Sequence, residues 1–184
     1  MNKIAKGFTL IELLIVIALL GALAVALLAS LDPLEQIKKG TDTGVRNTVS
    51  EVASSFTRYA SVQQGAFPVP TGDVAFHKIT KTDATTEGQK AIQKIIATGE
   101  LKPDFLTLAG DQLDKIWMTS TYSDAIQKVY ICFQPTAKSF KADLNTKYVL
   151  GAVPGTMNVT ATACDPVTGK NADVPPKDCY WCSQ

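Results

Sequence analysis

The sequence predicts an α+β protein in which a long N-terminal α-helix, one half membrane-spanning and one half amphipathic, packs on a small antiparallel β-sheet with a disulfide-stapled C-terminal loop. Three observations predict this fold. An apolar run over residues 8–31 leads into a segment with helical periodicity. Two later segments have the composition and alternation of strands, and all four cysteines fall in the last third of the chain.

The overall charge of the 184-residue chain is nearly balanced. Eighteen basic and 17 acidic residues give a formal net charge of +1. This balance provides no bulk attraction for nucleic acid, so no sequence-specific nucleic-acid partner is expected. The apolar residues are distributed unevenly, because Glu12 is the only charged residue between Phe8 and Leu31. Residues 32–184 are polar on average and long enough to bury a core of their own.

The apolar run is long enough to cross a membrane. As a helix, residues 8–31 would extend about 36 Å, against a hydrocarbon core of about 30 Å. Lys3 and Lys6 precede the run, which predicts a cytoplasmic N-terminus and an exported C-terminal body. A carboxylate in such a helix costs about 2.5–3.5 kcal/mol at the bilayer centre and less near its edge. Glu12 therefore predicts a functional role and a positively charged partner.

The segment Gly7-Phe-Thr-Leu-Ile-Glu12, together with the apolar run, resembles the class III signal of type IV pilins and type II secretion pseudopilins. The resemblance is close from Lys6 to about Leu31. It implies that a prepilin peptidase cuts between Gly7 and Phe8 and N-methylates Phe8. It also implies that Glu12 pairs with the terminal amine of a neighbouring subunit during assembly. Methylation would leave that amine positively charged.

The function implied by this resemblance is that of a structural subunit of a type IV pilus, in adhesion, motility or DNA uptake. The expected partners are identical subunits, the prepilin peptidase, the pilus assembly machinery and, before assembly, inner-membrane lipid. The expected location is the cytoplasmic membrane as a single-pass precursor, then an extracellular filament. One alternative is a pseudopilin of a type II secretion system. An alternative of another class is a signal-anchored surface binding protein that never polymerises.

Two simpler interpretations of the N-terminus remain open. A secretory signal peptide would be cut after Ala24-Val-Ala26, but its apolar region would span only about 7–15 residues, and cleavage there would discard Glu12. A plain signal-anchor would make Glu12 incidental. The pilin-like interpretation predicts a leader at 1–7, a transmembrane and assembly helix at 8–31, and a periplasmic or extracellular domain at 32–184.

The globular part should begin with the amphipathic half of the long helix. Asp32-Pro33 predicts a kink or restart, with Asp32 and Glu35 as a capping box. The helix should continue to about residue 62, because apolar residues recur at spacings of four and three: Val45, Val49, Val52, Phe56 and Tyr59.

A second helix and several strands are expected further along the chain. The helix should cover 86–98, with Thr86 and Gln89 as a capping box and Gly99 as its stop. Residues 116–122 and 125–134 should form a hairpin, with further strands at 74–79 and 148–153.

The cysteines predict disulfides if the domain is exported. Cys132, Cys164, Cys179 and Cys182 allow three pairings, and the sequence does not choose among them. The spacing from Cys179 to Cys182 leaves a zinc site or a redox pair as alternatives, although a second C-x-x-C is missing. The proline-containing tail at 165–184 should be a loop without a core, restrained by these bridges.

No catalytic set is found in the sequence, so neither an enzyme nor a cofactor is expected. His77 is the single histidine and is expected on the surface. Four residues in the tail are calcium candidates or, alternatively, turn residues: Asp165, Asn171, Asp173 and Asp178. Trp117, Tyr180 and Trp181 would form either an adhesive patch or internal packing, with Trp181 shielding a disulfide.

Overall fold

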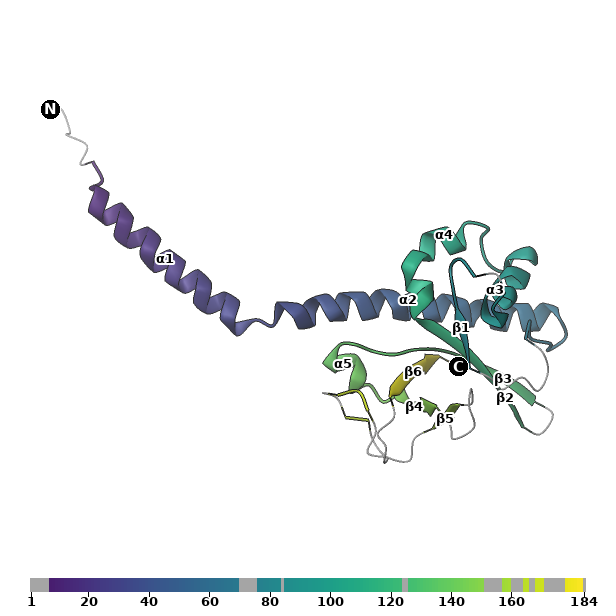
Figure 1. The fold of residues 1–184 in the computed structure, drawn as a ribbon. Helices are drawn as coiled ribbons and strands as arrows, with labels where there is room; N and C mark the ends of the chain where they lie inside the picture. Colours follow the sequence, from purple (N-terminus) through teal and green to yellow (C-terminus); the bar gives the residue numbers. More distant parts are fainter. Residues whose placement is uncertain are drawn as a thin grey trace. The chain divides into compact units, whose positions relative to one another are not determined.

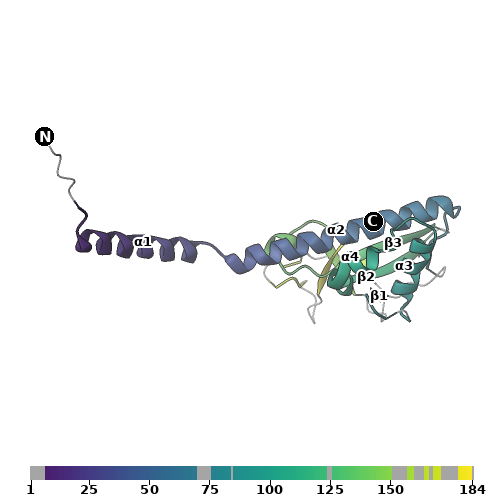
Figure 2. The ribbon, with the colours of Figure 1, turned by 90° about the horizontal axis from the view of Figure 1, so that it is seen from above.

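The computed structural model describes residues 7–69, 76–83, 85–123, 126–150, 157–159, 164–165, 168–170 and 178–183. The chain divides into two compact units, Met1–Gln36 and Ile37–Gln184. Figures 1 and 2 show the helices and the sheet. The predicted α+β class, with an antiparallel sheet and two disulfides, is confirmed.

The first unit contains helix α1, Leu10–Ser30, and the start of α2, Pro33–Val62. Leu31 is extended, with φ −96° and ψ 141°, so the helix restarts at Pro33 as expected. The Asp32 carboxylate accepts a hydrogen bond from the Glu35 backbone N–H at 3.2 Å and so caps α2. Among the described residues, α1 is the helix long and apolar enough to span a membrane, with a mean hydropathy of 2.9.

The core of the second unit lies between α2 and one face of the sheet. The predicted stripe on α2 is confirmed, because Val45, Val49, Val52 and Phe56 are at most 1% exposed. This stripe shares one apolar cluster with residues from four strands: Ile79, Ile116, Met118, Ile131, Phe133 and Trp181. Burial of this apolar surface, rather than helix propensity, accounts for most of the stability of such a helix.

The described residues form a six-stranded sheet with the order β1-β2-β3-β6-β4-β5, and all its pairs are antiparallel. The strands are β1 (His77–Ile79), β2 (Ile116–Ser123), β3 (Ile126–Phe133), β4 (Thr146–Leu150), β5 (Met157–Val159) and β6 (Cys179–Ser183). The expected hairpin is confirmed, with register from Ile116↔Phe133 to Ser123↔Ile126. Parts of the strands expected at 74–79 and 148–153 lie outside the described residues.

The C-terminal end of the chain is more than a stapled loop. Residues Cys179–Ser183 form β6, which pairs with β3 on one side and with β4 on the other. Its first four residues are at most 6% exposed. The expectation that the whole tail lacks a core is therefore wrong for this segment, because pairing with two strands buries it.

Short helices complete the second unit. Helix α3 covers Glu87–Ala97, and the Thr86 hydroxyl accepts a hydrogen bond from the Gln89 N–H. The predicted capping box is only half formed, because the buried Gln89 Oε1 has no partner. Gly99 has φ +82° and ends the helix as expected. Three elements were not expected: α4 (Phe105–Ala109), the 3₁₀ helix η1 (Gly110–Lys115) and α5 (Lys138–Lys141).

Candidate functional site

The predicted processing and assembly residues lie at the start of α1. Thr9 is the N-cap, and it forms a complete capping box with Glu12. The Thr9 backbone N–H and hydroxyl donate to Glu12 Oε2 at 2.9 and 2.6 Å, and the Glu12 N–H donates to the Thr9 hydroxyl at 3.3 Å. The capping box thus satisfies two backbone donors, the N–H groups of Thr9 and Glu12, that would otherwise remain unpaired at the helix start.

One oxygen of this carboxylate remains available. Both hydrogen bonds from Thr9 go to Oε2, and no described residue donates to Oε1. The capping box also fixes the side-chain direction of Glu12 beside the segment that precedes the helix. A cation that approaches this point would meet a carboxylate that is already positioned.

Gly7 and Phe8 precede α1 in irregular, exposed backbone. The Phe8 side chain is 78% exposed, and no atom lies within 4 Å of the Cβ position of Gly7. A protease needs an accessible backbone outside regular structure, and Gly7 and Phe8 meet that requirement. Cleavage between Gly7 and Phe8 and methylation of Phe8 remain predictions.

Helix α1 itself presents apolar side chains on all sides. None of its residues is buried, and its leucines, isoleucines and valines are 44–82% exposed. A helix that is hydrophobic all round requires lipid or other helices around it. The bilayer and a bundle of equivalent helices are both suitable surroundings.

The cysteines are paired as Cys132–Cys182 and Cys164–Cys179. The first bridge joins facing residues of β3 and β6, and the second closes a loop with a sequence separation of 15. The zinc and redox alternatives are not supported, because Cys179 and Cys182 have different disulfide partners. Among the described residues, no group of three or more His, Cys, Asp or Glu could hold a metal.

The aromatic residues of the tail are packing residues. Trp181 lies on the α2 face of the sheet, with its ring 4.9 Å from the Arg46 guanidinium and 5.6 Å from the Phe133 ring. It does not shield the Cys132–Cys182 bridge, because neighbouring residues of a strand face opposite sides. Tyr180 packs with these two cysteines, and Trp117 lies against Tyr180 with ring centroids 5.6 Å apart.

The calcium candidates are not brought together in the described residues. Asp165 Oδ1 accepts a hydrogen bond from the Thr168 N–H at 2.8 Å, which is a turn role. Asp178 forms a β-bridge with Lys170, and Asn171 and Asp173 lie outside the described residues. His77 lies in β1 opposite Met118, within the expected strand, and it is half-buried instead of exposed on the surface as expected.

Sequence reasoning found Glu12 but missed Thr9. The signal was present, because Thr9-x-x-Glu12 has the capping-box spacing that was recognised at Thr86. The charge of Glu12 predicts a partner in another subunit, whereas its partner in the structure is Thr9 of the same helix start.

The fold and this segment define a membrane-anchored precursor with a helical N-terminal anchor and a disulfide-bonded α+β domain. Residues 2–28 match the family described as the prokaryotic N-terminal methylation motif. The match covers the leader, Glu12 and most of α1, and it supports a pilin-like or pseudopilin-like protein with a class III signal. No curated protein and no solved structure matches the chain.

Proposed function

We propose that this chain is a structural subunit of a type IV pilus-like filament, trimmed between Gly7 and Phe8 and polymerised through α1. The observation that carries the proposal is Glu12, a carboxylate fixed by a capping box at the first turn of an entirely exposed apolar helix. In a lipid anchor alone this carboxylate would only cap the helix, at the cost of placing a charge in an apolar segment. In a subunit that leaves the bilayer for a helical bundle, the charge can also pair with a cation of a neighbouring subunit.

The driving force for polymerisation follows from the exposure of α1. In the bilayer, lipid chains cover its apolar side chains, and in a filament the α1 helices of neighbouring subunits would replace them. Because lipid is as apolar as leucine, this exchange gains little from hydrophobicity itself. An ion pair in a medium that contains little water can provide both affinity and register.

Cleavage would create the missing cation. The new amine at Phe8 lies one residue before Thr9 and remains positively charged when methylated. Glu12 Oε1 is then the acceptor offered to the amine of an incoming subunit. Before cleavage the Phe8 nitrogen is part of the peptide bond to Gly7 and carries no charge. Assembly would therefore follow processing.

In this proposal the globular unit is non-enzymatic and forms the outer surface of an extracellular filament. A pseudopilin of a type II secretion system would use the same signal and the same helix. Both roles require processing and polymerisation. Both therefore differ from the role of a signal-anchored surface protein that remains a monomer.

The first test is the intact mass and N-terminal sequence of the native protein. The proposal requires loss of residues 1–7 and a methylated Phe8. A mature chain that begins at Met1, or after Ala26, would contradict it.

The second test separates the charge of Glu12 from its capping role. Glu12→Gln retains an acceptor for Thr9 but removes the charge, so it should leave the precursor membrane-bound and processed while pelletable filaments are lost. Glu51→Gln removes an exposed carboxylate of α2 and should assemble normally. Filaments at the wild-type level from Glu12→Gln would exclude the proposed ion pair.

A further inference from the structure

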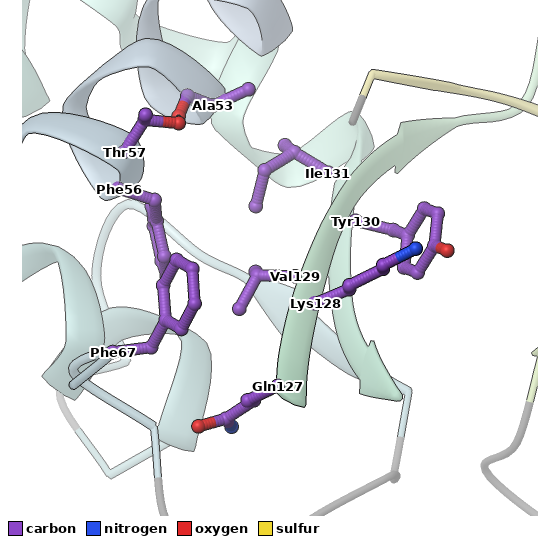
Figure 3. A pocket seen from close by; sticks show the side chains of 9 residues that line it. All are labelled: Ala53, Phe56, Thr57, Phe67, Gln127, Lys128, Val129, Tyr130 and Ile131. Carbon is purple, nitrogen blue, oxygen red and sulfur yellow. The ribbon is translucent and has the colours of Figure 1, made fainter. Parts of the chain in front are cut away.

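A groove opens on one flank of α2, between this helix and the part of β3 that extends past β6. In the part of the chain that the structure describes, β6 pairs with β3 from Ile131 to Phe133. Beyond that point the groove has a volume of about 270 Å³. Figure 3 shows Ile131 and Val129 directed toward the α2 residues Ala53 and Phe56, with Phe67 beside Phe56.

The floor of this groove is apolar and its rim is polar. Phe56 and Ile131 are at most 1% exposed, whereas Val129 and Phe67 are only half-buried. Thr57 and Lys128 are exposed at the rim. The groove is therefore suited to one apolar side chain whose neighbouring residues are negatively charged.

The second unit presents such a side chain on α4. Leu108 is 76% exposed, whereas its neighbours Leu106 and Ala109 pack against the core. Asp104 occupies the N-cap position of the same helix without a side-chain capping hydrogen bond. Asp111 follows the helix, with its side chain 96% exposed and one carboxylate oxygen 3.9 Å from Lys81 Nζ. Leu108 is thus an apolar side chain with acidic residues on both sides, which complements a groove with a lysine at its rim.

Leu108 and the groove lie on opposite flanks of α2. Element η1, which directly follows α4, contacts α2 through Gln112, which lies 3.2 Å from the Cβ position of Gly44 and accepts a hydrogen bond from Thr48 at 2.7 Å. Gly44 and Thr48 each precede a groove residue, Ala53 and Thr57, by nine positions. Nine residues are about two and a half helical turns. The groove residues of α2 therefore lie about 180° around the helix from the residues that contact Gln112, and about 13 Å further along its axis. Figure 1 shows α4 and α5 on opposite sides of α2.

We propose that the groove binds α4 of a second copy of this chain, with Leu108 inserted between α2 and β3. The inference rests on the proposed function. Because the two surfaces are distinct and face away from each other, the contact is heterologous and each subunit can use both. A heterologous contact that does not close into a ring repeats as an open helical array, which is the arrangement that the proposed filament requires.

The test uses the full-length chain in cells that assemble the filament. Leu108→Asp and Thr57→Arg should each lower pelletable filament by about tenfold or more, because one buries a charge and the other fills the groove. Their matched controls are Leu144→Asp, at a leucine that is 90% exposed, and Ser54→Arg, at an exposed position on the outer side of α2. Both controls should assemble like wild type, and all four variants should be processed and oxidised normally.

A photo-crosslinking residue, p-benzoylphenylalanine, at the exposed rim position 128 identifies the occupant without filling the groove. The expected product is a dimer in which position 128 is joined to the peptide that contains Leu108. Capture of another protein, capture of another surface of a second copy, or normal filaments from Leu108→Asp would each overturn the inference while the proposed function stands. Absence of filaments from the wild-type chain would overturn both.

Discussion

Asp42 on α2 holds Thr136, in the loop after β3, through both of its carboxylate oxygens. Oδ2 accepts from the Thr136 backbone N–H and Oδ1 from its hydroxyl, each at 2.8 Å. Oδ2 also accepts from the Ala137 N–H at 2.7 Å. Asp42 is 2% exposed, so a charged side chain in the helix fixes the loop that leads into α5.

Removal of this carboxylate should destabilise the second unit in a graded manner. Asp42→Ala leaves two backbone donors without an acceptor and should lower the free energy of unfolding by about 2–4 kcal/mol. Asp42→Asn keeps one oxygen for these donors and should cost about 1 kcal/mol. Urea unfolding of the full chain in detergent measures both. Asn47→Ala, an exposed change on the same helix, is the control, and equal stabilities of the Ala and Asn variants would contradict the argument.

Tyr180 should make the domain sensitive to alkaline pH. Burial, and in addition the nearby Asp178 carboxylate, raise the pKa of its hydroxyl above the ordinary value of 10.0. Below pH 10 both folded and unfolded chains keep the proton, so stability is unaffected. Between the unfolded and the folded pKa the unfolded state binds fewer protons, so the free energy of unfolding falls as pH rises.

Urea unfolding between pH 8 and 11 checks this behaviour. The wild-type chain should lose stability above pH 10, and Tyr180→Phe should reduce that loss. Tyr59→Phe leaves Tyr180 in place and should retain it. An identical pH dependence for wild type and Tyr180→Phe would show that Tyr180 does not control it.

The parts of the fold that the sequence predicts are those with local signals. The stripe from Val45 to Phe56 and the alternation in the β2–β3 hairpin depend on residues close together in the chain, and both are confirmed. Strand β6 could not be predicted in this way. Its first four residues, Cys-Tyr-Trp-Cys, follow a proline-containing segment. They become a strand because β3 and β4, far away in sequence, pair with β6 on both sides.

The same distinction applies to the candidate site. Glu12 is conspicuous because a charge is rare in an apolar run, whereas Thr9 is an ordinary residue that matters only through its geometry. The disulfide pairing and the groove beside β3 depend on the sheet order, which no local pattern encodes.

The two disulfides should contribute unequally to stability. Cys132–Cys182 closes a segment with a sequence separation of 50, and Cys164–Cys179 one of 15. Loop-closure entropy gives about 4 and about 3 kcal/mol, respectively. The first bridge is also buried between β3 and β6, so its replacement by two alanines removes packing as well. Thermal unfolding of the two double-alanine variants should therefore rank the Cys132–Cys182 variant as the less stable, and the reverse order would contradict this account.

Two glycines in helices should respond to alanine with opposite signs. A Cβ on Gly88 of α3 would lie 2.7 Å from the Lys78 carbonyl oxygen, a backbone atom of β1 that cannot move away easily. Gly88→Ala should therefore destabilise the domain by about 1–3 kcal/mol. Gly40 of α2 has no atom within 4 Å of its Cβ position, so Gly40→Ala should stabilise by about 1 kcal/mol through helix propensity alone. Urea unfolding of both variants checks the signs, and a stable Gly88→Ala would show that α3 can shift from β1.

Thr9 should stabilise the first turn of α1. Thr9→Val removes the hydroxyl that accepts from the Glu12 N–H and donates to its carboxylate, which should weaken the first turn by about 1 kcal/mol. That free energy corresponds to about fivefold faster amide hydrogen exchange in residues 10–13. Mass-spectrometric exchange of the full chain in micelles measures this rate, and Thr9→Ser, which keeps the hydroxyl, should exchange like wild type. If Thr9→Val also exchanges like wild type, the Thr9 hydroxyl does not stabilise the first turn, and the backbone N–H of residue 9 is sufficient to hold Glu12.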